Sequence, residues 1–255
     1  MKYSWSTLTL FMFLLICSFT YAVDIAIPTA VIPGGKGERA NKLSGDGSVG
    51  YSTTSGNTES DSLNARFSLR HEHGQWTHSV KLTALNMSAN DNTFAEQYLL
   101  SQGNRYRFRG KYEKFYGYGG LRYDKDRFSG FDYQSSAAVG IGWNALRLER
   151  HLLDFRFGVG YRHAEDIFEE RTEEGLFQGG TLYTFILSKN TTFDQEILIE
   201  AGESNTVVES ISSLKVGITS QIFVELMHTV KNNSDPPAGS TSANRVSNVN
   251  FTYQF

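Results

Sequence analysis

The feature that most constrains this chain is an apolar repeat with a period of two residues, which recurs along most of its length. Between residues 153 and 161 every odd position is apolar or aromatic, and the even positions are Asp, Arg or Gly. Residues 249–255 repeat the pattern with Val, Phe, Tyr and Phe separated by Asn, Thr and Gln. This alternation predicts strands with one apolar and one polar face, and no convincing helical period of 3.6 residues competes with it.

The repeats divide the chain into twelve expected strands, at 44–54, 62–73, 76–88, 94–108, 115–126, 132–143, 151–163, 175–187, 191–202, 206–218, 222–231 and 244–255. A tight turn at Gly74-Gln75 would pair Leu69 with Val80, and a turn at 219–221 would pair Val216 with Val224. Short turns at one end and longer loops at the other, with both termini on the turn side, are typical of outer-membrane barrels. The expected fold class is an all-β, transmembrane, antiparallel up-and-down β-barrel of about 12 strands.

The first residues read as an export signal. Lys2 precedes an apolar stretch from Leu8 to Phe19, and Thr20-Tyr21-Ala22 supplies a cleavage site with small outer residues. We therefore expect a signal peptide at 1–22, a periplasmic linker at 23–42 and the barrel at 43–255. Cys17 is the only cysteine, so the exported part would need no disulfide. A net charge of -3 argues against broad nucleic-acid binding.

Alternation alone does not separate a soluble β-sandwich from a membrane barrel, because both have one apolar face per strand. No apolar run after the leader is long enough for a spanning helix, so a membrane location requires a closed barrel. The chain ends on Phe255 with aromatic residues at 251 and 253, which resembles the C-terminal recognition signal of bacterial outer-membrane barrels. That resemblance implies the outer membrane as the location, its lipid and lipopolysaccharide as surroundings, and recognition of Phe255 by the barrel-assembly machinery.

Four segments resemble a known family. They are Gly47-Ser-Val-Gly-Tyr-Ser-Thr-Thr-Ser-Gly-Asn-Thr58, Tyr116-Gly-Tyr-Gly-Gly-Leu-Arg-Tyr-Asp124, Val139-Gly-Ile-Gly-Trp143 and Gly158-Val-Gly-Tyr-Arg162. Residues 44–255 are similar to the YdiY-like, salt-induced outer-membrane proteins (DUF481), a group classed as a domain of unknown function. The resemblance implies an outer-membrane barrel. It supplies no catalytic residue or cofactor, since the family has no assigned chemistry.

The polar faces of the expected strands would line the barrel lumen. Their charged members of both signs suggest wall charges that pair with one another, rather than a selective ring: Arg122, Asp124, Asp154, Arg156, Arg162, Asp194, Glu196, Glu200 and Glu225. Inward glycines, including Gly140, Gly142 and Gly158, leave room for water or for long Arg and Tyr side chains. We expect a narrow polar pore for ions or small solutes, or a structural barrel that supports the envelope under osmotic stress.

Three histidines form the strongest candidate metal site. His71 and His73 share a strand face, and the turn at Gly74-Gln75 places His78 opposite His71. Three imidazoles near a rim could bind zinc or copper, although a fourth ligand is not evident. The alternative, an amphipathic girdle at the membrane boundary, is favoured because rims of membrane barrels are rich in such rings.

A cluster of acidic residues marks the expected loop at 164–174: Glu165, Asp166, Glu169, Glu170, Glu173 and Glu174. These carboxylates could bind divalent cations that bridge lipopolysaccharide phosphates, which would make the barrel a surface binding or adhesion scaffold. No Ca²⁺-binding loop spacing is present, so an ordinary solvated loop is the favoured interpretation.

One pair of residues raises the alternative of a lipid hydrolase. The turn at 219–221 would place Ser212 opposite His228 on the outward face. A serine and a histidine without an orienting acid or oxyanion donors are weak evidence for catalysis. We therefore expect a protein that is not an enzyme and has no cofactor.

Overall fold

The computed structural model describes residues 41–55, 60–89, 92–126 and 131–255. The predicted signal peptide, and all but the last two residues of the predicted linker, lie outside these ranges. No helix in the described ranges is long and apolar enough to cross a membrane.

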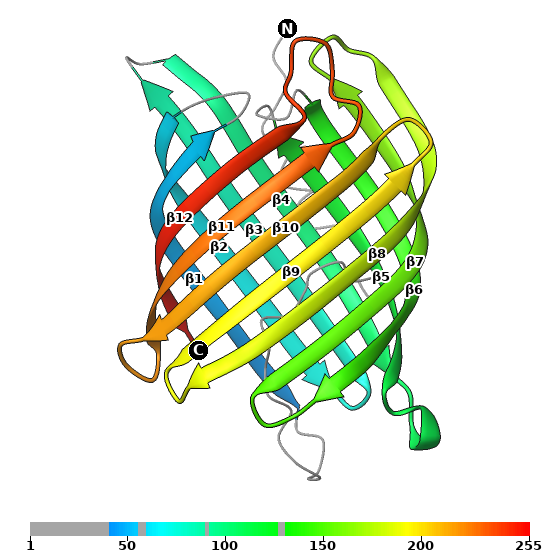
Figure 1. Ribbon diagram of the computed structural model, residues 1–255, viewed down its shortest axis with the longest axis vertical. Helices are drawn as coiled ribbons and strands as arrows, with labels where there is room; N and C mark the ends of the chain where they lie inside the picture. The colour runs from blue at the N-terminus through cyan, green and yellow to red at the C-terminus, as the bar shows by residue number, and fades with distance from the viewer. Residues whose placement is uncertain (1–40, 56–59, 90–91, 127–130) are drawn as a thin grey trace, which may run out of the picture.

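Twelve antiparallel strands form one closed barrel, as the sequence predicts (Figure 1). Each strand pairs with its neighbours in the chain, and the last pairs with the first. The strands are β1 (Lys42–Ser55), β2 (Ser60–His73), β3 (Trp76–Ala89), β4 (Asn92–Arg107), β5 (Phe115–Asp126), β6 (Phe131–Arg147), β7 (His151–Asp166), β8 (Arg171–Ser188), β9 (Thr191–Gly202), β10 (Thr206–Gly217), β11 (Ile222–Asn233) and β12 (Ala243–Gln254). A short 3₁₀ turn, η1 (Gly110–Tyr112), lies between β4 and β5.

The registers follow from the hydrophobic pattern. Leu69 lies opposite Val80, and Val216 lies opposite Val224, as the turn lengths predict. A slip of one residue would turn every side chain of a strand to the other face, so matching apolar positions fix the pairing. The confirmed registers place all apolar faces on one continuous outer surface.

The two faces of the barrel invert the arrangement of a water-soluble protein. Leu63 and Phe177 on the outer face are 76% and 74% exposed, whereas Asn250 on the inner face is fully buried. An exposed apolar band around a buried polar interior is the pattern of a barrel that spans a membrane. The closed ring also satisfies the backbone hydrogen bonds of every strand, which a hydrocarbon environment requires.

The loops at the two ends differ less than the sequence predicts. We call the end where β1 begins and β12 finishes the terminal end, and the opposite end the distal end. Among the distal connections that the structure describes, 234–242 is longer than the longest terminal turn, at 108–114, whereas 167–170 and 203–205 are shorter. The prediction of an acidic loop at 164–174 is wrong in its bounds. Strand β7 runs on to Asp166 and β8 begins at Arg171, so the connecting turn is 167–170. Arg171 Nε and Glu165 Oε2, 2.7 Å apart, help to extend this hairpin.

Candidate functional site

Charged side chains are concentrated on the wall of the lumen, whereas the outer face of the barrel is mainly apolar. The nine residues predicted to line it all lie on the inward face, opposite the exposed apolar residues. Burying a charge is costly unless it is paired, so the partners of these side chains determine how the charged lumen is stabilised.

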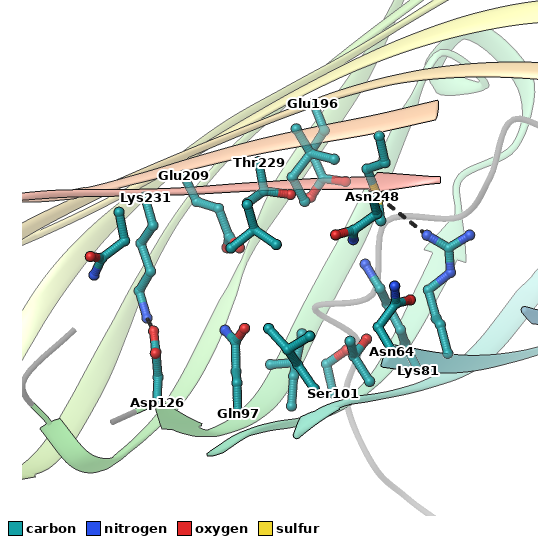
Figure 2. A pocket seen from close by; sticks show the side chains of 18 of the residues that line it. Asn64, Lys81, Gln97, Ser101, Asp126, Glu196, Glu209, Thr229, Lys231 and Asn248 are labelled. Carbon is teal, nitrogen blue, oxygen red and sulfur yellow. Dashed lines mark hydrogen bonds and ion pairs between the residues drawn. The ribbon is translucent and has the colours of Figure 1, made fainter. Parts of the chain in front are cut away.

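Five charged residues of β5, β10 and β11 form a continuous chain of ion pairs across the lumen. Arg122 lies 2.7 Å from Glu209 and 3.1 Å from Asp124, measured between guanidinium nitrogens and carboxylate oxygens. The ammonium of Lys231 lies 3.0 Å from Asp124 and 2.8 Å from Asp126; Figure 2 shows the second of these contacts. We call Arg122, Asp124, Asp126, Glu209 and Lys231 the distal belt, because they lie toward the distal ends of their strands.

The distal belt separates two cavities. A central cavity of about 90 Å³ and a smaller one of about 10 Å³ are both lined by Arg122, Glu209 and Lys231, which therefore stand between them. A water molecule needs roughly 10–15 Å³ of such space. The central cavity (Figure 2) can thus hold several waters or a small solute, and the smaller cavity about one water.

A second group of paired charges lies nearer the terminal end. The guanidinium of Arg66 forms ion pairs with Glu225 and with Asp46, and Ser213 donates a hydrogen bond to the other oxygen of Glu225 at 2.7 Å. On the facing wall, Arg105 lies 2.8 Å from Asp154. The expectation that the lumen charges pair with one another holds for these groups.

The room left by inward glycines is taken up by tyrosine rings at the positions described here. A Cβ atom on Gly142 would overlap the ring of Tyr116, and Cβ atoms on Gly140 and Gly158 would meet Tyr118. The Tyr116 hydroxyl donates to Asp154, and the Arg105 guanidinium lies 3.4 Å from the centre of the Tyr116 ring. The sequence left open whether water or long Arg and Tyr side chains fill the room beside these glycines; in this part of the lumen, side chains fill it.

Several important lumen residues were not singled out from the sequence: Asp46, Arg66, Lys81, Arg105, Asp126, Glu209 and Lys231. A signal for two of them was present. Lys231 has the same parity along β11 as Glu225, which was predicted to face inward, and Glu209 alternates with the outward Leu214 and Val216 of β10. Strict use of the two-residue period finds both.

The acidic cluster proves to be a paired hairpin end. Glu174 lies in β8 rather than in a surface loop, is 8% exposed, and pairs with Arg162 in the lumen; this corrects its predicted place. The carboxylate of Glu173 accepts a hydrogen bond from Tyr161 at 2.9 Å, and Asp166 accepts two from backbone amides of the 167–170 turn. Glu169 and Glu170 occupy that exposed turn.

The three histidines lie side by side at the terminal rim. The rings of His71 and His78 are 6.2 Å apart, those of His71 and His73 are 6.3 Å apart, and Trp76 stacks on His78 at 6.0 Å. Within the described ranges, no group of three or more His, Cys, Asp or Glu side chains is arranged to hold a metal ion. Aromatic rings gathered at the rim beside Trp76 are typical of the girdle.

Ser212 and His228 lie opposite each other on the outward face, as the register predicts. Their hydrogen bonds go elsewhere. The Ser212 hydroxyl donates to Gln195 at 2.6 Å, and His228 Nδ1 lies 2.8 Å from the hydroxyl of Ser247. The arrangement gives no support to a serine nucleophile activated by this histidine.

Comparisons with known proteins agree with the fold. The chain is 29% identical over 193 residues to the uncharacterized protein YdiY of Escherichia coli strain K12, covering 76% of this chain and 75% of the relative. The NanC porin structure matches with a TM-score of 0.55 at 12% identity, over 83% of this chain and 99% of the porin.

A Pseudomonas putida F1 outer membrane channel, COG4313, matches with a TM-score of 0.52 at 9% identity, over 89% of this chain and all of the channel. At such identities these two structures show the shared porin-like barrel and nothing of a solute. The model of the DUF481 proteins of unknown function matches residues 47–255, so the chain belongs to the DUF481 family.

Proposed function

We propose that this protein is a narrow pore of the bacterial outer membrane for ions or small polar solutes. The observation that carries the proposal is the charge-lined central cavity of about 90 Å³ inside a closed barrel, next to a belt made of side chains alone. Side chains can change rotamer and let a solute pass, whereas a backbone plug would have to unfold. The porin-like fold supports the same proposal.

The location is part of the proposal. A membrane-spanning barrel of this type, with aromatic residues such as Phe251 and Tyr253 on the outer face of β12, fits a place in the outer membrane. The terminal end would then face the periplasm, and outer-membrane lipid would surround the apolar band.

A structural barrel without transport is the second candidate, and one observation favours it. The distal belt crosses the lumen with each of its charges paired, which stiffens opposite walls of the barrel and leaves only small spaces beside it. A pore and a permanently closed barrel therefore differ in whether the belt opens.

Single-channel recording in planar bilayers tests the proposal. The refolded full chain should give discrete conductance steps that are small compared with those of wide porins, because twelve strands enclose a narrow lumen. A preparation unfolded by heat is the control for leakage caused by detergent. Absence of steps over a range of salts and voltages, for the wild type and for a variant with the belt removed, would establish the structural barrel instead.

A further inference from the structure

Two charges that line the central cavity stand apart from the ion-pair networks. Seven charged side chains line this cavity, and five of them, Arg66, Arg122, Asp126, Glu209 and Lys231, are held in ion pairs. The other two are Lys81 on β3 and Glu196 on β9. Within the part of the chain that the structure describes, neither has a hydrogen bond or ion pair through its side chain.

Lys81 and Glu196 face each other across the cavity. Strands β3 and β9 are six places apart in a ring of twelve, so the two side chains enter from opposite walls (Figure 2). No direct ion pair joins them, so the cavity between these two side chains has a positive and a negative end.

The remaining wall of the cavity defines the size and character of what fits between these ends. Aliphatic side chains of Leu99, Leu198, Ile211 and Val246 contribute to the lining. A volume of about 90 Å³, where one water needs roughly 10–15 Å³, has room for a small molecule of several non-hydrogen atoms. A solute with a negative group, a positive group and a small aliphatic body would match the Lys81 end, the Glu196 end and the aliphatic wall of this cavity.

We propose that the central cavity is a binding site for a small zwitterion of the amino-acid class, with its carboxylate on Lys81 and its ammonium on Glu196. Each of these two half-buried charges would then gain an ion-pair partner, as the charges of the distal belt already have. An anion or a cation alone would satisfy one wall and leave the other charge unpaired. As a statement about a pore substrate the inference rests on the proposed function, but the binding itself is measurable without conductance.

The test is equilibrium binding to the refolded full chain in detergent micelles, measured by saturation-transfer NMR. L-Alanine should bind saturably, and propionate and ethylammonium, which carry one charge each, should bind at least about tenfold more weakly because each leaves Lys81 or Glu196 without an ion-pair partner. Lys81→Met and Glu196→Gln should each lose alanine binding. The exchanged variant, Lys81→Glu with Glu196→Lys, should regain it because it still offers both charges.

Lys111→Met and Glu113→Gln, in the exposed turn between β4 and β5, are the matched controls and should bind alanine as the wild type does. Heat-modifiable gel migration confirms that each variant is folded. The inference is overturned if folded wild type does not bind alanine, if both single variants bind it unchanged, or if propionate binds equally well. A barrel that conducts ions without binding alanine would support the pore and contradict the zwitterion site. A barrel that binds alanine without conducting ions would support the zwitterion site and contradict the pore.

Discussion

Lys231 and Asp124 form an ion pair across the whole width of the barrel. Their charged atoms are 3.0 Å apart, although β11 and β5 are six places apart in a ring of twelve strands. The lumen at this level is therefore no wider than two side chains placed end to end. Because Asp124 also pairs with Arg122, and Arg122 with Glu209, a change at Lys231 affects the complete distal belt.

Replacing Lys231 with methionine should open the lumen. The substitution removes the cation that pairs with both Asp124 and Asp126 and so leaves an excess of buried carboxylate charge, which attracts water and cations. We expect the single-channel conductance to rise by at least about twofold, since the belt crosses the lumen from β5 to β11. Removing one partner of a buried ion pair should also lower the free energy of unfolding by about 3–5 kcal/mol.

Lys189→Met, in the exposed turn between β8 and β9, is the matched control and should change neither quantity. Bilayer recording measures the conductance, and urea titration in detergent measures stability. A Lys231→Met barrel that is folded and conducts no better than wild type would show that the constriction lies elsewhere.

Gly142→Ala should destabilise the barrel, because the added methyl group would overlap the ring of Tyr116. Tyr116 would have to move, which would disturb its hydrogen bond to Asp154 and its contact with Arg105. Overpacking of this kind costs typically about 1–3 kcal/mol. Gly179→Ala is the control, since nothing lies within 4 Å of a Cβ atom there. Equal urea midpoints for the two variants would contradict the close packing of Tyr116 on β6.

The fold was predictable from the sequence because the two-residue period carries it. Tyr161 and Arg162, for example, are adjacent in the sequence and so belong to opposite faces of β7; the structure places Tyr161 outside the barrel and Arg162 inside. Strand ends were less predictable. The polar residues between Ala164 and Glu174 resemble a loop in composition, but ion pairs such as Arg171 with Glu165 continue the hairpin beyond the apolar pattern.

The organisation of the lumen was predictable only in part. Parity gives the inward face of Lys231, but its pairing with Asp124 joins residues 107 positions apart in the chain. That contact depends on the diameter and stagger of the closed barrel, which no local pattern encodes. The unpaired state of Lys81 and Glu196 is likewise a property of the assembled lumen.

Zinc binding should be the same in the wild type and in the His71→Ala/His78→Ala double variant. Ring nitrogens of His71 and His78 already contact the amide oxygens of Asn41 and Asn104, and Trp76 stacks on His78, an arrangement suited to the membrane boundary. Isothermal titration with zinc provides the comparison. A distinctly tighter affinity in the wild type would restore the metal interpretation of these histidines.

The seam between β1 and β12 should be sensitive to the size of the residue at position 45. Gly45 and Phe255 exchange two backbone hydrogen bonds of 2.9 Å, which join the start of the barrel to the last residue of the chain. A Cβ atom at Gly45 would lie 2.7 Å from the Phe255 ring and 2.7 Å from the carbonyl oxygen of Ser68, and the carbonyl belongs to backbone that is fixed in the sheet.

Gly45→Ala should therefore strain the closure and lower the temperature at which the folded gel band disappears, with a loss of stability of about 1–3 kcal/mol. Gly47→Ala is a close control, because it lies two residues further along the same strand and nothing stands within 4 Å of its Cβ position. Both variants lose the same glycine flexibility, so only crowding at the seam separates them. If the two folded bands disappear at the same temperature, the contact between Gly45 and Phe255 does not limit closure of the barrel.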